Sequence, residues 1–215
     1  MVHLVLFCIF VYAALPTSNK YSCTVLDRIP LGDGNTIEIV NDTCQNGLPH
    51  TTDARTIRMT RDAYADSSVE STLKHERIHL AQKTNPEAWR RFYRESWGYE
   101  IQRQPPPDVP HEFVAALRPN PDTADTPYAI WGGRYIFLPT YAGTERTLRG
   151  ARVVIYDRVL KRDLKTPPPE WKALFCLEGK CPFQYEHPHE LAAELWTDDS
   201  TSPAGAMLRE WSNGR

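Results

Sequence analysis

The sequence lacks a strong excess of charge of either sign, so nucleic acid is not an expected partner. Its 25 Lys and Arg residues nearly balance its 27 Asp and Glu residues, giving a net charge of −2. A nucleic-acid-binding domain normally carries a basic patch or stripe. The one local group of arginines, at Arg90, Arg91 and Arg94, is interleaved with aromatic residues and is typical of the polar face of a helix.

Long hydrophobic runs are scarce, and the single one, Leu4 to Leu15, is too short for a transmembrane helix of about 20 residues. Its length fits a secretory signal peptide. We therefore expect residues 1–19 to be a signal peptide and the protein to be secreted. No Lys or Arg precedes the run, so an uncleaved signal anchor holding the protein at a membrane is the alternative. After export, Asn41 in Asn-Asp-Thr would be an N-glycosylation site.

Cysteine is also sparse, with five residues in the chain. Cys8 lies in the apolar run, which leaves an even set for disulfides in an oxidising compartment. Closeness in sequence favours pairing Cys23 with Cys44 and Cys176 with Cys181. The paired Cys-x-x-Cys spacing of structural zinc sites is missing, so we expect two disulfides rather than a cysteine-bound metal.

Internal repeats and low-complexity segments are missing too, and the length of 215 residues suits one well-buried domain. We expect that domain to span residues 20–215. Turn-forming residues separate short β-like stretches, and others precede segments of helical periodicity. The expected strands are 36–40, 56–60, 135–138 and 153–156, and the expected helices are 67–83, 85–98, 112–117 and 190–196.

Two of these helices carry start and stop signals. Ser67 and Glu70 stand three apart, as in a capping box. Asn85 followed by Pro86 predicts the start of the next helix, and Gly98 predicts its end. Its aromatic residues recur at helical spacing and are predicted to lie in the core, namely Trp89, Phe92, Tyr93 and Trp97.

The first helix contains His75-Glu76-Arg77-Ile78-His79, which fits the pattern H-E-x-x-H. Residues four apart lie on one helical face, about 5 to 6 Å apart at Cβ, so His75 and His79 can both reach one Zn²⁺ ion. Glu76 then points toward water in an open coordination position. Zinc lowers the pKa of such water toward about 7, which predicts Glu76 as a general base.

A catalytic zinc site needs a third protein ligand, and two glutamates are candidates. Glu100 follows His79 by 21 residues, whereas Glu190 follows it by 111. Glu190 is favoured because Glu194 lies one helical turn later and could accept the free N–H of a zinc-bound imidazole. Glu100 remains the alternative ligand.

Other polar residues are further candidates for the site, with less support from the sequence. Tyr185 and His187 are candidate hydrogen-bond donors to the oxyanion that forms during hydrolysis. His189 could replace Glu190 as a ligand, or it could occupy the fourth position of the metal, which would close the site. Asp122 lies in a turn-forming stretch and could bind a cation if neighbouring loops helped.

Together, His75-Glu76-x-x-His79 and Glu190-x-x-Ala193-Glu194 resemble the gluzincin branch of zincin metallopeptidases. The stretch from His75 to Gln82 also resembles uncharacterised zincin-like proteins that read H-E-x-x-H-x-x-Q. The resemblance implies an α+β, zincin-like fold, in which a small twisted sheet packs on the metal helix and long insertions are irregular. It also implies a zinc metallopeptidase acting on peptide or protein substrates. The alternative is an exported binding domain with a structural or vestigial metal site.

Overall fold

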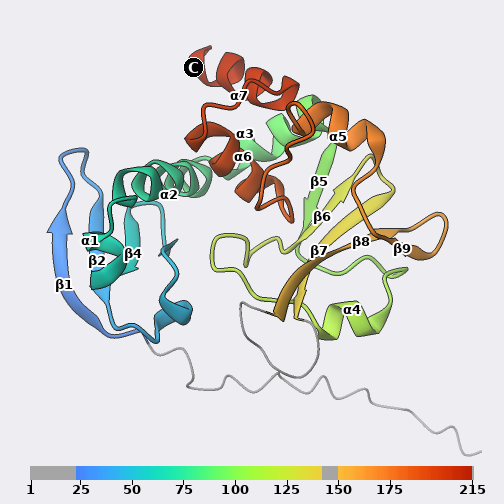
Figure 1. Cartoon of the computed structure of the whole chain (residues 1–215). Helices are drawn as coiled ribbons and strands as arrows, with labels where there is room; N and C mark the ends of the chain where they lie inside the picture. Colours follow the sequence, from blue (N-terminus) through green and yellow to red (C-terminus); the bar gives the residue numbers. More distant parts are fainter. Residues whose placement is uncertain (1–22, 142–149, 215) are drawn as a thin grey trace, which may run out of the picture.

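The computed structural model describes residues 23–141 and 150–214, which form an α+β fold with two β-sheets joined by helices (Figure 1). The predicted signal segment, residues 1–19, lies outside the described residues. Within the described ranges, no helix combines the length and the apolar composition that crossing a membrane requires.

The chain forms two groups of strands, with helices between the groups and after the second. The strands are β1 Val25–Pro30, β2 Thr36–Val40, β3 His50–Thr51, β4 Thr56–Thr60, β5 Tyr99–Gln102, β6 Tyr128–Trp131, β7 Tyr135–Tyr141, β8 Ala151–Asp157 and β9 Arg162–Leu164. The helices are α1 Arg61–Ala65, α2 Val69–Thr84, α3 Pro86–Phe92, α4 His111–Ala115, α5 Pro169–Phe175, α6 Pro188–Thr197 and α7 Pro203–Asn213, with the short turns η2 Cys44–Gly47 and η3 Tyr93–Trp97.

The first sheet, sheet A, confirms the predicted strands 36–40 and 56–60. Its order is β1-β2-β4-β3, with β2 and β4 parallel and the other pairs antiparallel. Isoleucines from β2 and β4 are buried together with Leu73 and Leu80 of α2. The small sheet therefore packs on the helix that carries the H-E-x-x-H pattern, as expected.

The second sheet, sheet B, corrects the prediction of long irregular insertions. Five antiparallel strands, in the order β5-β6-β7-β8-β9, run through residues 99–164. Only parts of β7 and β8 are foreseen from the sequence. The other strands are missed because much of this sheet is covered on both faces, so its strands lack the alternation of a half-exposed strand.

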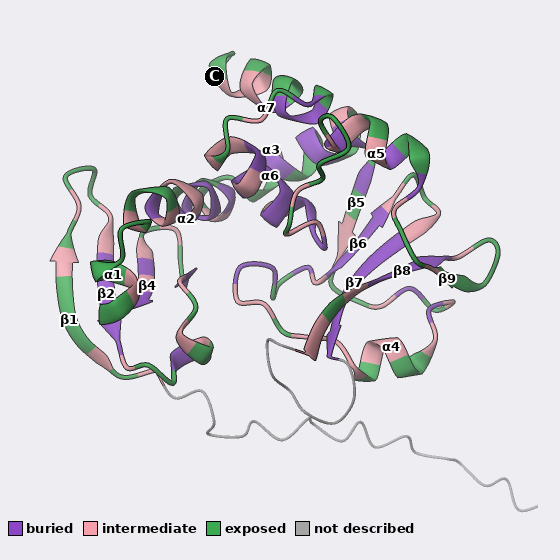
Figure 2. Cartoon of the chain, in the orientation of Figure 1, coloured by how far each residue is buried: buried purple, intermediate pink, exposed green. Residues whose placement is uncertain are grey.

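The two faces of sheet B contribute to two separate cores, visible as purple segments in Figure 2. Phe137 and Ile155 lie on the face covered by α5, α6 and η3, where Trp171 and Leu191 belong to the same core. On the other face, Ile136, Leu138 and Val154 form a core against α4. Since α6 packs on both sheet B and α2, it joins the two sheets.

The start of α2 differs from the predicted capping box. The helix begins at Val69, and its cap residue, Ser68, makes no side-chain capping bond. Instead, the Asp66 carboxylate accepts from the Ser68 N–H, 2.7 Å away, and the Asp66 carbonyl accepts from Val69. This turn leaves Ser67 before the first helical turn, where it cannot pair with Glu70 as a capping box requires.

The next helix confirms the predicted stop and the predicted aromatic core. Asn85 occupies the cap position of α3, although its side chain makes no capping bond. The chain continues through the π-helical turn η3 to Gly98, whose φ of 72° ends it in the left-handed region that favours glycine. The four aromatic residues are all buried, namely Trp89, Phe92, Tyr93 and Trp97.

Both predicted disulfides are confirmed: Cys23 is bonded to Cys44, and Cys176 to Cys181. Two disulfides are typical of proteins in an oxidising compartment. The Asn41 amide donates to the Thr43 hydroxyl within the predicted glycosylation sequence, just after β2.

Candidate metal centre

The site begins with two histidines one turn apart on α2. Their spacing brings both imidazoles to the same face of the helix. The Nε2 atoms of His75 and His79 lie 3.1 Å apart. His79 is fully buried, whereas the His75 side chain is 16% exposed and borders the cleft.

Glu190, from the first turn of α6, is the acidic residue that meets these histidines. Its Oε2 lies 3.3 Å from His75 Nε2 and 3.4 Å from His79 Nε2. Glu100, the alternative, is exposed on β5, a strand of sheet B. The fold thus assembles His75, His79 and Glu190, and leaves Glu100 out of the cluster.

The separations of these three atoms fit one metal ion. Ligand atoms about 2.0 to 2.1 Å from a tetrahedral ion lie about 3.3 to 3.4 Å from one another. The observed triangle has sides of 3.1, 3.3 and 3.4 Å. Hence these three side chains could hold a metal ion with only small adjustments.

Gln82, one turn after His79, orients the buried imidazole. The His79 Nδ1–H donates to Gln82 Oε1 at 2.8 Å, which leaves His79 Nε2 facing the cluster. The amide nitrogen of Gln82 donates to the Tyr93 hydroxyl and to the His189 carbonyl, both at 3.0 Å. These two contacts fix which way the amide faces.

The prediction for Glu194 is therefore corrected, because its carboxylate does not receive an imidazole N–H. It accepts from the backbone N–H groups of Phe183 and Gln184 instead. The orienting role that the sequence suggested for Glu194 belongs, for His79, to Gln82.

Asn120 orients Glu190 from the loop between α4 and β6. Its side-chain amide donates to Glu190 Oε1 at 2.8 Å, which turns Oε2 toward the histidines. The loop is anchored on both sides of Asn120, by Arg118 pairing with Glu186 at 2.7 Å and by Asp122 pairing with Lys83 at 3.1 Å. The sequence gives no sign of Asn120, since its role depends on a contact across 70 residues.

Glu76 lies beside the cluster, next to His75 on the helix. The residue is 4% exposed, and its Oε2 has no hydrogen-bond partner among the described residues. Burial raises the pKa of Glu76 to about 8, and Asp122 and Glu190 add to this rise. An unpaired buried carboxylate oxygen is costly and normally serves a ligand, a proton or an ordered water.

The electrostatic balance of the cluster favours a positive charge at its centre. Burial lowers the pKa of His79, but Glu190 more than offsets this and raises it to about 10. Conversely, burial raises the pKa of Glu190, while the histidines hold it well below its usual range. A proton or a cation between these groups satisfies both of them.

Asp122 forms a second acidic contact with the site. One of its oxygens accepts from the Thr51 N–H at 3.0 Å, from the Thr51 hydroxyl and from Lys83. The possible ligand atoms of Asp122, Glu76 and His79 also lie within 4.8 Å of one another. Because Lys83 already neutralises Asp122, we expect a cation to bind to the cluster of His75, His79 and Glu190 instead.

His187, one of the two predicted oxyanion donors, is occupied by structural contacts. His187 Nε2 donates to the Thr126 carbonyl at 2.9 Å, and its Nδ1 accepts the His189 N–H as the cap of α6. Tyr185 packs on the rings of Phe137 and Trp171. His187 thus has no free N–H for substrate, which corrects that prediction. Tyr185 is partly buried against the core, and its role as a donor stays a prediction.

His189 does not join the cluster either, although the sequence leaves it as an alternative ligand. Its Nδ1 pairs with the Asp122 carbonyl at 3.2 Å. In residues 23–141 and 150–214, no fourth His, Cys, Asp or Glu completes the set of His75, His79 and Glu190. A third candidate group, Cys23, Cys44 and His50, contains disulfide-bonded sulfurs, which are not the thiolates that bind metals.

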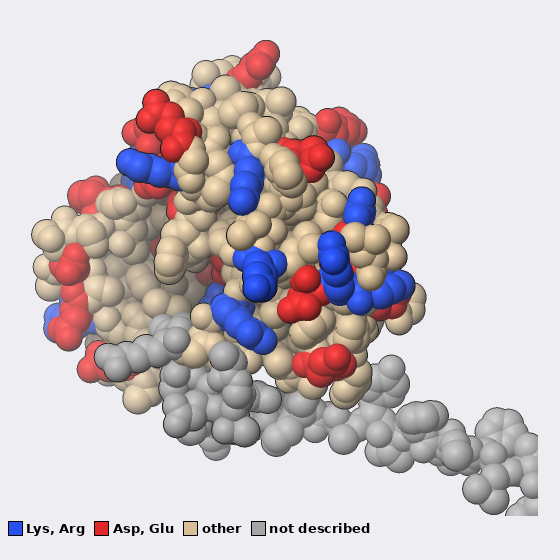
Figure 3. All heavy atoms as spheres, turned by 45° about the vertical axis from the view of Figure 1, so that its right-hand side comes forward, with Lys and Arg blue, Asp and Glu red and all other residues tan. Residues whose placement is uncertain are grey.

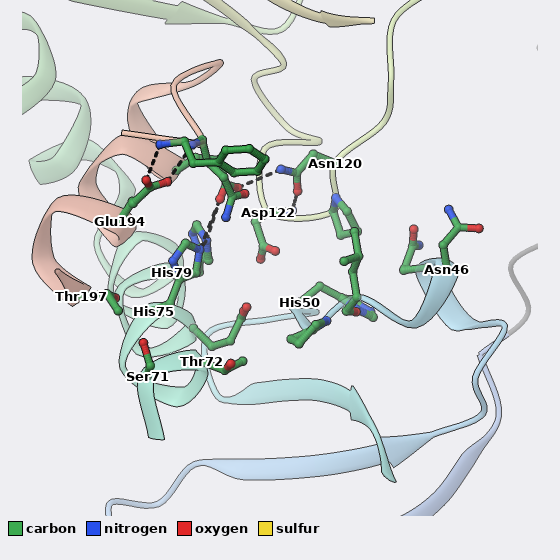
Figure 4. Close-up of a pocket in the computed structure, with 18 of the residues that line it drawn as sticks. Asn46, His50, Ser71, Thr72, His75, His79, Asn120, Asp122, Glu194 and Thr197 are labelled. Atoms are coloured by element: carbon green, nitrogen blue, oxygen red, sulfur yellow. Dashed lines mark hydrogen bonds and ion pairs between the residues drawn. The ribbon is translucent and has the colours of Figure 1, made fainter. Parts of the chain in front are cut away.

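The cluster lies in an open cleft of about 530 Å³. Figure 4 shows His75 and His79 on α2, with Asn120 and Asp122 on the facing loop and Glu194 above. Residues after η2, including His50, form the far wall. In the space-filling view a hollow opens between sheet A and the rest of the molecule, and acidic and basic side chains are interspersed on that face (Figure 3).

Comparison with protein-family models, with curated proteins and with solved structures finds no match to this chain.

Proposed function

We propose that this protein is a zinc-dependent hydrolase that cleaves peptide bonds. The observation that carries the proposal is the triangle of His75 Nε2, His79 Nε2 and Glu190 Oε2, with sides of 3.1 to 3.4 Å. Two nitrogens and one carboxylate oxygen are a typical ligand set of catalytic zinc. A zinc ion held there would leave one position for a water molecule and lower the pKa of that water toward about 7.

The remaining residues supply proton transfer and orientation. A bound zinc ion would favour the charged form of the Glu76 carboxylate. Its Oε2, which has no other hydrogen-bond partner among the described residues, would then accept the proton of the attacking water and pass it to the leaving nitrogen. Gln82 and Asn120 hold His79 and Glu190 in their ligating orientations, as outer hydrogen bonds do in metal sites. The cleft admits substrate from solvent.

An open site supports a catalytic role over a structural one. A structural zinc is normally closed by four protein ligands, whereas three are assembled in the described part of the chain. The arrangement of metal helix, small sheet and distal glutamate supports a zincin-like fold of the gluzincin type. The two disulfides support a secreted protein.

The test is to replace Glu76 with Gln, which keeps the shape of the side chain and removes its proton-accepting charge. The purified full chain, with zinc, is incubated with a mixture of peptides of varied sequence, and products are identified by mass spectrometry. We expect Glu76→Gln to bind zinc as the wild type does and to lose roughly a hundredfold to ten-thousandfold in turnover.

Glu70→Gln is the matched control, because Glu70 is exposed in the first turn of the same helix. Its turnover should equal that of the wild type. Stoichiometric zinc without cleavage of any peptide by the wild type would refute the hydrolase and favour a binding domain with a structural or vestigial metal site.

A further inference from the structure

Phe183 is placed unusually for an aromatic residue. It is 88% exposed, more than any other large hydrophobic residue in the described ranges. It also lines the cleft that contains His75 and Glu190. Covering an apolar ring that is exposed to water lowers the free energy and therefore favours binding.

The backbone at Phe183 is attached to the helix that carries Glu190. The carboxylate of Glu194, one turn after Glu190 on α6, accepts the N–H groups of Phe183 and Gln184, the latter at 2.7 Å. Because two charge-assisted hydrogen bonds hold the backbone, the position of Phe183 is coupled to the candidate metal centre.

The segment before Phe183 is a closed hairpin. Leu177 and Lys180 exchange backbone hydrogen bonds of 2.9 Å in both directions, and Glu178 and Gly179 both have positive φ, at 50° and 79°. This turn is bridged by the disulfide between Cys176 and Cys181.

The segment after Phe183 is held as well, by Tyr185 against Phe137 and Trp171. Phe183 is therefore exposed although the chain on both sides of it is well anchored. Binding to such a pre-organised group avoids much of the usual ordering cost.

The segment after η2 also contributes apolar residues to the cleft. Leu48, which is 42% exposed, and Pro49 line the cleft from the side of sheet A. The cleft thus combines apolar residues from two distant segments of the chain with the polar cluster of His75, His79 and Glu190.

We propose that Phe183 is a specificity-determining residue, which binds a large apolar side chain of a peptide substrate close to the bond that is cleaved. This inference rests on the proposed function. A peptide with glycine at the same position would not cover the Phe183 ring, so the ring would not strengthen its binding.

The experiment compares peptide pairs that differ only in having Leu or Gly at one position near the cleavage site. Phe183→Ala in the zinc-loaded full chain should lower kcat/KM for the Leu peptides roughly tenfold to a hundredfold and leave the Gly peptides unchanged. Phe183→Leu should retain most of the preference. Leu160→Ala is the control, since Leu160 is 51% exposed and does not line the cleft.

Equal kcat/KM ratios for Leu and Gly peptides in the wild type and Phe183→Ala would overturn the inference, as would a uniform loss on both. If the wild type cleaves no peptide, the proposed hydrolase fails by itself. Peptide binding to the zinc-loaded Glu76→Gln variant then decides about Phe183. A Kd preference for Leu peptides that Phe183→Ala abolishes supports its role, and no such preference refutes it.

Discussion

At the scale of single residues, the candidate centre depends on side chains that orient others. The His79 imidazole is fully buried and has one ring nitrogen for Gln82 and one for the cluster. Gln82 is itself held by Tyr93 and the His189 carbonyl. A chain of hydrogen bonds thus runs from the aromatic core to the His79 ring, and it directs Nε2 toward the cluster, as a metal ligand requires.

Replacing Gln82 with Ala should weaken zinc binding roughly tenfold to a hundredfold, because His79 loses the acceptor for its Nδ1–H. Competition with a chelating dye measures the affinity. Gln104→Ala, an exposed glutamine after β5, should bind as the wild type does. Unchanged affinity in Gln82→Ala would show that His79 needs no such orientation.

The helical histidine pair could be predicted from the sequence because a spacing of four residues requires no knowledge of the tertiary fold. The spacing of Glu194 from Glu190 favours Glu190 as the third ligand, although in the structure Glu194 contacts Phe183 and Gln184. Gln82 carried a usable signal, since it follows His79 by three residues on one helical face. Asn120 has no such sequence signal, because its contact with Glu190 spans 70 residues.

At the scale of elements, the packing of α7 after α6 is set by a close backbone approach. Gly205 is buried in the first turn of α7, and a Cβ at this position would overlap the Ser200 carbonyl oxygen. Only glycine allows the two chain segments to approach this closely. The Ser202 hydroxyl caps the same turn by accepting from the Gly205 N–H at 3.2 Å.

Gly205→Ala should lower the free energy of unfolding by about 1 to 3 kcal/mol, as overpacking in tight sites does. Urea denaturation followed by tryptophan fluorescence measures it, because Trp211 of α7 packs on Trp89. In Gly32→Ala the added Cβ meets no atom within 4 Å, so this control should change little. Equal midpoints for the two variants would contradict the close approach.

The elements that could be predicted from the sequence are those with a regular hydrophobic period or with a residue that marks a helix end. Strand 56–60 alternates, and Gly98 marks a helix end. Sheet B was largely missed, because β6 and β7 are buried through most of their length, and a continuous apolar run does not distinguish a strand from a buried helix. No sequence pattern distinguishes the π-helical turn η3 from the end of an α-helix.

At the scale of the whole molecule, sheet A and sheet B lie on opposite sides of the structure (Figure 1). The contact between α2 and α6 brings His75, His79 and Glu190 together. The site therefore depends on the stability of both sheets. In sheet B, Arg134 donates to Asp157 at 2.9 and 2.6 Å and ties β8 to the β6–β7 turn.

This ion pair predicts a loss of stability in acid. The hydrogen bonds from Arg134 are the largest cause of a pKa of about 2 for Asp157, below the usual value of about 3.9. Its contribution is present above about pH 4 and is lost as the pH falls toward 2. The stability difference between wild type and Asp157→Asn should therefore shrink from about pH 5 to pH 2 in urea titrations. Asp163→Asn, exposed on β9, should show no such trend.

Our central claim is that one divalent cation is held by His75, His79 and Glu190, and zinc titration of matched variants tests it most directly. Calorimetry of the wild type should give one tight equivalent. Glu190→Gln should lose most of that affinity, while Glu100→Gln, altered on exposed β5, should keep it. No tight site in the wild type, or unchanged affinity in Glu190→Gln, would contradict the account.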